Sequence, residues 1–211
     1  MIITVASYKG GVGKSTTAVH LAAFLQRTAP TLVVDGDKIR TPTKWSQRGN
    51  GAGLPFKVVS HVQMINHIRN YRHVVIDTEG SLSDADFKDV AENCDLLVIP
   101  AVPETAATDG LTETLAMLHK INSKHYKVLI TMAPPKPSTD AHQLREMLIS
   151  QNIPVFETEI PKTKAFDHAT AAGVPIYGIK GERAERAWAA YEATGKEILN
   201  GEAARQVRSV G

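Results

Sequence analysis

The feature that most constrains the fold is a glycine-rich turn near the start of the chain. The run Lys9–Thr16 reads Lys-Gly-Gly-Val-Gly-Lys-Ser-Thr and follows the short β-branched segment Ile2–Ala6. After it, Thr17–Arg27 carries apolar residues at helical spacing. A glycine-rich turn between a strand and a helix brings backbone N–H groups and a helix N-terminus together, an arrangement that binds phosphate. The sequence therefore predicts a phosphate loop that binds ATP, and an ordinary strand–helix turn is the alternative.

Each part of this loop has its own expected task. The glycines let the backbone approach a phosphate closely and adopt positive φ angles. Lys14 is expected to reach the β- and γ-phosphates of ATP, and the Ser15 hydroxyl to be a ligand of Mg²⁺. The residues predicted to contact the nucleotide are Lys9, Gly10, Gly11, Val12, Gly13, Lys14, Ser15 and Thr16.

Further along the chain, apolar runs of strand length alternate with segments of helical period. Continuous apolar runs are typical of strands buried on both faces, as in a parallel sheet. The alternation predicts an α/β fold, doubly wound, with a mostly parallel sheet and helices on both faces. The expected strands are Ile2–Ala6, Thr31–Asp35, His73–Asp77, Asp95–Ala101 and Lys127–Met132, and the expected helices are Thr17–Arg27, Ser83–Glu92, Ala107–Asn122, Thr139–Gln151 and Glu182–Leu199.

The length of 211 residues suits one substantial domain. We expect residues 1–200 to form a single ATPase domain. Residues 201–211 have little apolar content and are expected to be a frayed tail. The segment Arg40–Pro55 is polar and rich in glycine and threonine, so it is expected to be mostly loop, with one turn around Thr43–Gln47.

Composition excludes several classes of protein. Cys94 is the only cysteine, so a disulfide framework and a multi-cysteine metal site within one chain are both excluded. No apolar run approaches the roughly 20 residues that a membrane helix needs. The net charge of +2 permits a nucleic-acid partner without requiring one. We therefore expect a cytoplasmic protein.

Three acidic residues stand where predicted strands end. Asp35 and Asp37 lie at the end of the second apolar run, in Val-Val-Asp-Gly-Asp, and Asp77 ends the run His-Val-Val-Ile-Asp. In doubly wound sheets, ligands bind at the carboxyl ends of the strands. The three carboxylates are therefore predicted to lie near the phosphate loop. Any one of them could instead be a strand-end carboxylate that caps a loop.

The phosphate loop departs from the ordinary motif in one place. The spacing G-x-x-x-x-G-K-[ST] would put glycine at position 8, but the chain has Tyr8 there, followed by a second lysine, Lys9. The pattern K-G-G-x-G-K-S-T resembles that of the deviant Walker A ATPases, the family that includes ParA and MinD. The chain length and the segment Thr41–Trp45 are similar to those of short ParA-type members, the ParF-like partition ATPases and McdA-like positioning ATPases.

This resemblance implies roles for individual residues. In the family, the extra lysine reaches across a dimer that encloses two nucleotides, so Lys9 is implied to contact the partner subunit's ATP; a surface lysine beside the loop is the alternative. Asp37 is implied to orient the attacking water. Asp35 is implied to help hold the Mg²⁺ shell, with Asp77 as the Walker B acid that holds Mg²⁺ through a water. The implied catalytic residues are Lys9, Lys14 and Asp37.

Two positions beside these acids depart from the family pattern. Asp37 is followed by Lys38-Ile39, where the family commonly has Pro-Gln. The segment Thr78-Glu79-Gly80 resembles the family's switch segment, which couples the γ-phosphate to the shape of the dimer. Glu79 is unusual in that segment, and we assign it no catalytic role.

A late segment resembles the part of the family that flanks adenine. Glu159–Lys162 reads Glu-Ile-Pro-Lys, and Ala172–Ile176 reads Ala-Gly-Val-Pro-Ile. By this resemblance, Pro161 is the candidate for a contact with the base.

The function that this resemblance implies is that of a ParA-type ATPase. Such a protein forms an ATP-dependent homodimer, binds DNA without sequence preference and positions a cargo until a ParB-like or adaptor partner stimulates hydrolysis. Its expected location is cytoplasmic and nucleoid-associated. The candidate DNA contacts are Lys180, Arg183 and Arg186, although a solvated helix face is an equal alternative because Glu182 and Glu185 are interleaved.

Two other functions stay open. A MinD-like ATPase that cycles on membranes would need a basic amphipathic C-terminal helix with bulky apolar residues, and residues 201–211 offer only Val207 and Val210. No stable membrane binding is therefore expected. The other is a metabolic relative. A reductase with a shared iron–sulfur cluster would need two cysteines per subunit, which a lone Cys94 does not supply, and a biosynthetic ligase would need a substrate pocket that the sequence does not indicate.

Overall fold

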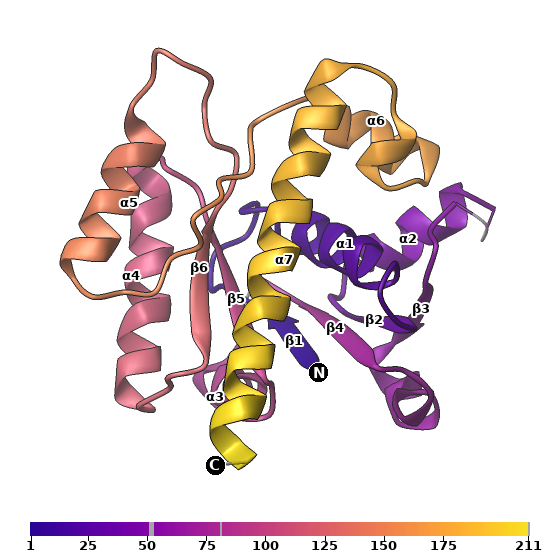
Figure 1. Cartoon of the computed structure of the whole chain (residues 1–211), viewed down its shortest axis with the longest axis horizontal. Coiled ribbons are helices and arrows are strands. Elements are labelled where there is room, and N and C mark those ends of the chain that lie inside the picture. The colour runs from indigo at the N-terminus through magenta and orange to yellow at the C-terminus, as the bar shows by residue number, and fades with distance from the viewer. Residues whose placement is uncertain (51–52, 81, 211) are drawn as a thin grey trace.

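The computed structural model describes residues 1–50, 53–80 and 82–210. The described chain forms a six-stranded sheet in the order β3-β2-β4-β1-β5-β6, and every neighbouring pair is parallel (Figure 1). This confirms the predicted doubly wound α/β fold. The strands are β1 Ile2–Val5, β2 Thr31–Gly36, β3 Lys57–Ser60, β4 His73–Thr78, β5 Leu96–Ala101 and β6 Tyr126–Ile130. The helices are α1 Lys14–Leu25, α2 Thr41–Arg48, α3 Asp84–Glu92, α4 Thr105–Lys120, α5 Asp140–Ser150, α6 Ala165–Ala172 and α7 Glu182–Val210, with 3-10 turns η1 His61–Asn66, η2 Ile68–Asn70 and η3 Ile176–Gly178.

The central strands send alternate side chains into two separate cores. Along β5, Val98 packs into the core that α1 and α7 cover, whereas Leu97 and Ile99 pack into the core under α3, α4 and α5. All three side chains are fully buried. Successive side chains of a strand point to opposite faces of the sheet, so a continuous apolar run requires helices on both faces. This is why the unbroken apolar runs identified the fold class correctly.

The edge of the sheet around β3 was not predicted. β3 has only four residues, and Lys57 and Ser60 at its ends give it no continuous apolar run. A small core of Leu32, Val34, Val59 and Val74 lies beneath the 3-10 turns η1 and η2 instead of beneath an α-helix. Two side chains of η1 point away from this core, Val62 at 86% exposed and Ile65 at 79%.

The segment Arg40–Pro55, expected to be mostly loop with one turn around Thr43–Gln47, contains the eight-residue helix α2, which includes that turn. Pro42 occupies the first turn of this helix, where its missing N–H costs no hydrogen bond. Trp45 is almost fully buried, and its Nε1–H donates to the backbone oxygen of Val174 at 3.1 Å. Tertiary packing of Trp45 therefore overrides the weak helix propensity of the flanking residues. Gly51 and Ala52, in the same segment, lie outside the described residues.

The short helix α6, which the sequence did not predict, packs against α2 through glycine. Gly173 ends α6 with φ of 71°, and a Cβ placed on it would lie 2.0 Å from the backbone nitrogen of Gly49. A side chain at position 173 would therefore be excluded by both its φ angle and its neighbour. This contact fixes the segment after α6, which leads to η3 and α7.

Helix α7 is longer than predicted. It runs to Val210, past the Leu199 at which we expected it to end, and Figure 1 shows it crossing the whole molecule in front of the sheet. Its middle packs on α1 at Gly195, where an added Cβ would lie 2.1 Å from the ring of Phe24. The fraying of residues 201–211 stays a prediction, and Gly211 lies outside the described residues.

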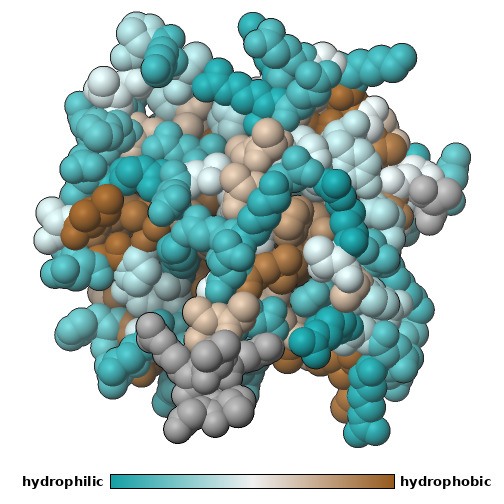
Figure 2. Space-filling view, in the orientation of Figure 1, coloured by the Kyte–Doolittle hydropathy of each residue, from teal (hydrophilic) through white to brown (hydrophobic). Residues whose placement is uncertain are grey.

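The face that carries α6 and the start of α7 is largely hydrophilic, with small separated apolar patches (Figure 2). None of the helices in the described part of the chain is apolar over a stretch long enough to cross a bilayer.

Candidate functional site

The glycine-rich loop leads from β1 into α1 and leaves an open cradle above its backbone. Gly11 and Gly13 have φ angles of 75° and 90°, which favour glycine. A Cβ added at Gly10 or Gly11 would meet no atom within 4 Å, so the space over the loop is free for a ligand. The Thr131 hydroxyl donates to the backbone oxygen of Val12 at 2.8 Å and ties the loop to the end of β6. The loop is thus shaped and held as an anion-binding turn.

Lys14 supplies the positive charge of this cradle. Its side chain is only 7% exposed, and its Nζ donates to the backbone oxygen of Lys9 at 2.7 Å. Burial lowers the pKa of Lys14, while the nearby carboxylates of Asp77 and Asp37 act in the opposite direction. A buried ammonium with few partners interacts strongly with an anion, because the local dielectric is low.

Asp77, at the end of β4, is the most unusual group of the site. It is fully buried, and neither of its carboxylate oxygens has a hydrogen-bond partner among the described residues. Burial raises its pKa to about 7; the carboxylates of Asp35 and Asp37 add to this rise, while the Ser15 hydroxyl and Lys14 oppose it. A buried carboxylate without a partner is costly unless it serves a ligand.

The residues around Asp77 fit a hydrated Mg²⁺ ion. Mg²⁺ keeps several water ligands and takes one or two protein oxygens together with phosphate oxygens. Ser15 would supply a direct ligand and Asp77 would hold the ion through a water. The described residues contain no group of three or more His, Cys, Asp or Glu side chains able to hold a metal by themselves. Water and the phosphates of a nucleotide would therefore complete the shell.

Asp35 and Asp37 take different positions, although they are two residues apart. The Asp35 carboxylate accepts hydrogen bonds from the N–H of Asp37 at 3.2 Å, from the N–H of Thr43 at 3.0 Å and from the Thr43 hydroxyl. It thereby holds the loop that carries Asp37, which is the alternative that the sequence analysis left open for each of the three acids. Its share in the Mg²⁺ shell stays a prediction. Asp37 lines the phosphate cavity, with one oxygen accepting from the N–H of Ile39 at 2.9 Å.

Two adjoining cavities extend from the loop and share Gly13, Thr16 and Met132. The phosphate cavity has a volume of about 620 Å³, and the second, called here the base cavity, has a volume of about 580 Å³. Each volume lies within the range of small-molecule sites in proteins. The phosphate cavity is lined by Gly10, Gly11, Gly13, Lys14, Ser15, Thr16, Asp37, Lys38, Ile39, Thr41, Glu79, Gly80 and Met132.

The base cavity contains Pro161, the residue predicted to contact adenine, together with Phe166 and Tyr191. It also contains Arg183, which we had predicted only as a DNA contact. Lys180, Arg183 and Arg186 are all exposed, and they lie before or in the first turns of α7. Of these three basic residues, Arg183 alone lines the base cavity.

His20 was missed by the sequence analysis. It is fully buried in α1, where its Nδ1 bonds the backbone oxygen of Thr16 at 2.7 Å and its Nε2 accepts from the N–H of Ile176 at 3.0 Å. Because Nε2 accepts, Nδ1 carries the proton, and burial lowers the pKa of His20 to about 4. His20 thus links the helix of the phosphate loop to the segment near the base cavity. A single histidine in a helical pattern gave no signal of this contact.

Lys9 does not line the phosphate cavity of its own chain. Its side chain is half-buried against α4, since a Cβ added at Gly110 would lie 2.7 Å from Lys9 Cβ. The lining of the phosphate cavity begins one residue later, at Gly10.

Known proteins share this fold and sequence pattern. The chain is 31% identical over 201 residues to "Maintenance of carboxysome distribution protein A" from Gloeobacter kilaueensis, covering 93% of each chain. A plasmid partition protein from Borrelia burgdorferi bound to AMPPNP has a similar structure, with a TM-score of 0.71 and 21% identity over 95% of this chain and 98% of that one. The MinC:MinD cell division complex of Aquifex aeolicus gives a TM-score of 0.73 at 16% identity, covering 95% of this chain and 96% of its match.

The two structural matches, at such low identity, speak for the fold alone. The model of the CobQ/CobB/MinD/ParA nucleotide binding domain family matches residues 3–176, which include the phosphate loop, all three acids and Pro161. The chain therefore belongs to the CobQ/CobB/MinD/ParA family of nucleotide-binding domains.

Proposed function

We propose that this chain is a ParA-type ATPase that positions a large cargo. One observation carries the proposal: Lys14, a buried ammonium on the wall of the phosphate cavity, lies near Asp77, a buried carboxylate with no hydrogen-bond partner among the described residues. A structural turn would have no use for a buried ammonium beside a buried carboxylate that accepts no hydrogen bond. A nucleotide with a divalent cation would satisfy both.

The proposed chemistry is ATP hydrolysis. Lys14 and the backbone N–H groups of the loop would bind the phosphates and stabilise the charge that develops as the terminal phosphate leaves. Asp37, on the wall of the phosphate cavity, would orient the attacking water. Mg²⁺, held through Ser15 and Asp77, would supply charge neutralisation of the phosphates.

ATP would also act as the switch for dimer formation. Lys9 does not line its own phosphate cavity, and its stem packs on α4. By the resemblance to the deviant Walker A ATPases, we infer that its ammonium contacts a nucleotide bound by a second copy. This placement supports a homodimer that closes over two ATP molecules. The dimer would then present two copies of the exposed basic residues Lys180, Arg183 and Arg186 to DNA phosphates.

The cargo is proposed from the relatives. The relative with 31% identity is named for carboxysome distribution, and the Borrelia protein for plasmid partition. Both names describe the placement of a large object inside a cell. We infer a cargo of this kind, recognised through a ParB-like or adaptor protein that stimulates hydrolysis, and a location on the nucleoid in the cytoplasm.

A binding assay tests the proposal. The full chain is incubated with ATP and Mg²⁺, and its binding to random-sequence duplex DNA and to anionic liposomes is measured at several salt concentrations. We expect DNA binding that requires ATP and weakens steeply with salt, because the contacts are to phosphates. Binding to liposomes alone would instead indicate a MinD-like membrane cycle and overturn the DNA-based function.

Two variants give the controls. Lys14→Ala should lose ATP binding and, with it, DNA binding. Lys44→Ala removes an exposed lysine of α2 that is absent from the lining of either cavity, and it should behave as the parent protein. If Lys14→Ala binds ATP normally, the phosphate-loop assignment is wrong.

A further inference from the structure

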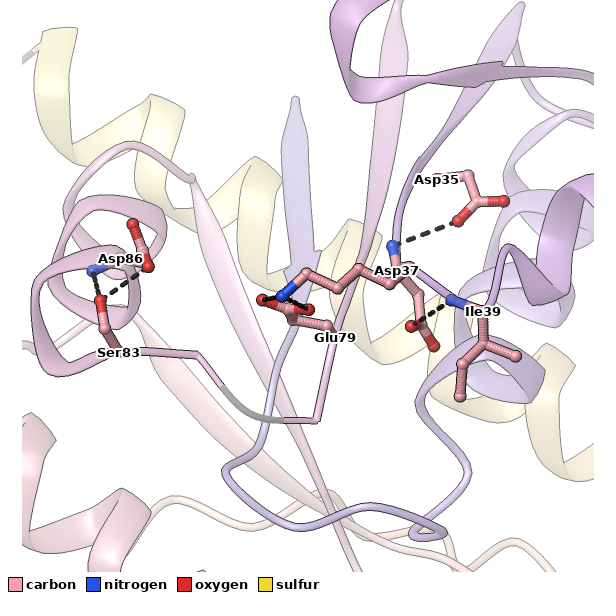
Figure 3. A network of polar contacts seen from close by, with 7 residues as sticks. Asp35, Asp37, Ile39, Glu79, Ser83 and Asp86 are labelled. Atoms are coloured by element: carbon pink, nitrogen blue, oxygen red, sulfur yellow. Dashed lines mark hydrogen bonds and ion pairs between the residues drawn. The ribbon is translucent and has the colours of Figure 1, made fainter.

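An ion pair joins two loops across the phosphate cavity (Figure 3). Lys38 belongs to the loop after β2, and Glu79 to the segment after β4. Lys38 Nζ lies 3.1 Å from one carboxylate oxygen of Glu79 and 3.4 Å from the other. Both residues line the same cavity as Lys14 and Ser15. They are also the two positions at which the sequence departs from the family pattern beside the acids, so the two departures meet in one contact.

The backbone beneath this ion pair is firmly held. A Cβ added at Gly36 would lie 2.8 Å from the backbone oxygen of Asp77, so the ends of β2 and β4 are in close contact. Asp35 accepts hydrogen bonds from the loop that follows it, and Asp37 accepts from the N–H of Ile39. Figure 3 shows the bonds of Asp35 to Asp37 and of Asp37 to Ile39 on the side of the loop away from Glu79. The part of this arrangement that can move easily is therefore the long side chain of Lys38.

The two partners differ in exposure, and this decides which of them moves. The side chain of Lys38 is 86% exposed, whereas that of Glu79 is 21% exposed. An ion pair with one strongly exposed partner is weak, and a lysine ammonium on its flexible stem can exchange partners by rotating its side chain. Glu79 is left on the wall of a cavity that suits anions. Its charge there opposes a bound phosphate unless a cation neutralises it.

We propose that Lys38 is a specificity-determining residue that distinguishes ATP from ADP by leaving Glu79 and contacting the terminal phosphate of ATP. The proposal rests on the proposed nucleotide site. A terminal phosphate offers an ammonium more negative charge and more acceptor oxygens than one carboxylate does. ADP lacks that group, so Lys38 stays paired with Glu79 when ADP is bound. Glu79 therefore competes with the terminal phosphate for Lys38, and the competition sets the preference for ATP.

The test compares the affinities of AMPPNP and ADP, each with Mg²⁺, for the full chain by isothermal titration calorimetry. AMPPNP keeps three phosphates without being hydrolysed during the measurement. Lys38→Met should lower the preference for AMPPNP over ADP by about tenfold, as expected for the loss of one charge-assisted contact. Glu79→Gln should raise the same preference, because it removes the competing charge. Lys44→Met, on an exposed lysine outside both cavities, is the matched control and should leave the preference unchanged.

Opposite shifts in Lys38→Met and Glu79→Gln support the exchange. If both variants keep the parent's preference for AMPPNP over ADP, or if both shift it in the same direction, the exchange is overturned. Either substitution in a purely structural ion pair removes the same contact, so both would have the same effect. A fall in Lys38→Met without a rise in Glu79→Gln also overturns it. These results differ from failure of the proposed function, in which the parent protein binds neither nucleotide, or Lys14→Ala binds both as the parent does.

Discussion

At the scale of single residues, Asp77 is expected to lower the stability of the nucleotide-free protein near neutral pH, while it serves the proposed Mg²⁺ site. Its carboxylate is fully buried without a hydrogen-bond partner among the described residues, and its pKa is raised to about 7. In the unfolded chain the group has its ordinary pKa of 3.8. Because the folded value is the higher one, the folded protein binds the extra proton between these two values. The stability contributed by protonated Asp77 is thus present at low pH and is lost as the pH rises through about 7.

We therefore predict that Asp77→Asn stabilises the nucleotide-free protein at high pH. The variant removes the buried charge, so the free energy of unfolding at pH 8 should rise by about 1–3 kcal/mol. At pH 5 the gain should be smaller, because Asp77 is then protonated in the folded protein but still mostly ionised in the unfolded chain, and the gain should nearly vanish only below the ordinary pKa of 3.8. Urea denaturation at the two pH values measures both numbers. The same variant should lose the Mg²⁺ dependence of ATP binding, since Asn carries no charge for the ion.

The contradicting result is specific. If Asp77→Asn destabilises the nucleotide-free protein equally at pH 5 and pH 8, the carboxylate has hydrogen-bond partners in the folded protein. The pKa of Asp77 is then not raised by folding.

At the scale of elements, the packing of α7 on α1 depends on one missing side chain. Gly195 lies in the interior of a 29-residue helix, where glycine is intrinsically unfavourable. Its place is explained by the ring of Phe24, which an added Cβ would approach to 2.1 Å. Glycine at position 195 therefore allows α7 and α1 to approach closely, at the expense of helix propensity in α7.

We predict that Gly195→Ala destabilises the protein by about 1–3 kcal/mol through overpacking, despite the gain in helix propensity. The matched control is Gly201→Ala on the same helix, where an added Cβ meets no atom within 4 Å. That variant should gain up to about 1 kcal/mol. Thermal unfolding of the two variants beside the parent protein measures the difference. Stabilisation of both variants would mean that α7 and α1 are farther apart than the structure has them.

The same elements show what the sequence could and could not predict. The sheet was predictable because its central strands, such as β5, are buried on both faces and therefore read as continuous apolar runs. α2 and α6 were not, because their stability comes from Trp45 and from the contact of Gly173 with Gly49, which join segments far apart in the chain. The phosphate loop was predictable because its chemistry is local. The partners of Asp35 within its own loop, the buried His20 and the pairing of Lys38 with Glu79 depend on how strand ends and helices meet.

At the scale of the whole molecule, Lys9 provides the test of the proposed dimer. We predict that Lys9→Ala binds ADP with nearly the affinity of the parent protein, since Lys9 lies outside its own phosphate cavity. ATP-dependent dimerisation should weaken by about tenfold or more, as expected for a lost charge-assisted contact across an interface. Sedimentation velocity with ATP and Mg²⁺ measures the dimer fraction. Lys44→Ala serves again as control, and a Lys9→Ala protein that dimerises and hydrolyses ATP normally would refute the role of Lys9 between subunits.

Helix α7 begins where Arg183 lines the base cavity and, with 29 residues, reaches the opposite pole of the molecule (Figure 1). A straight helix of that length is a stiff lever arm of about 40 Å. With such an arm, a tilt of only about 5° at its first turn would carry its last turn through roughly 3–4 Å. The distance between a spectroscopic label near Asn200 and a second label on the sheet would therefore report, in amplified form, a small movement that nucleotide produces at the start of α7.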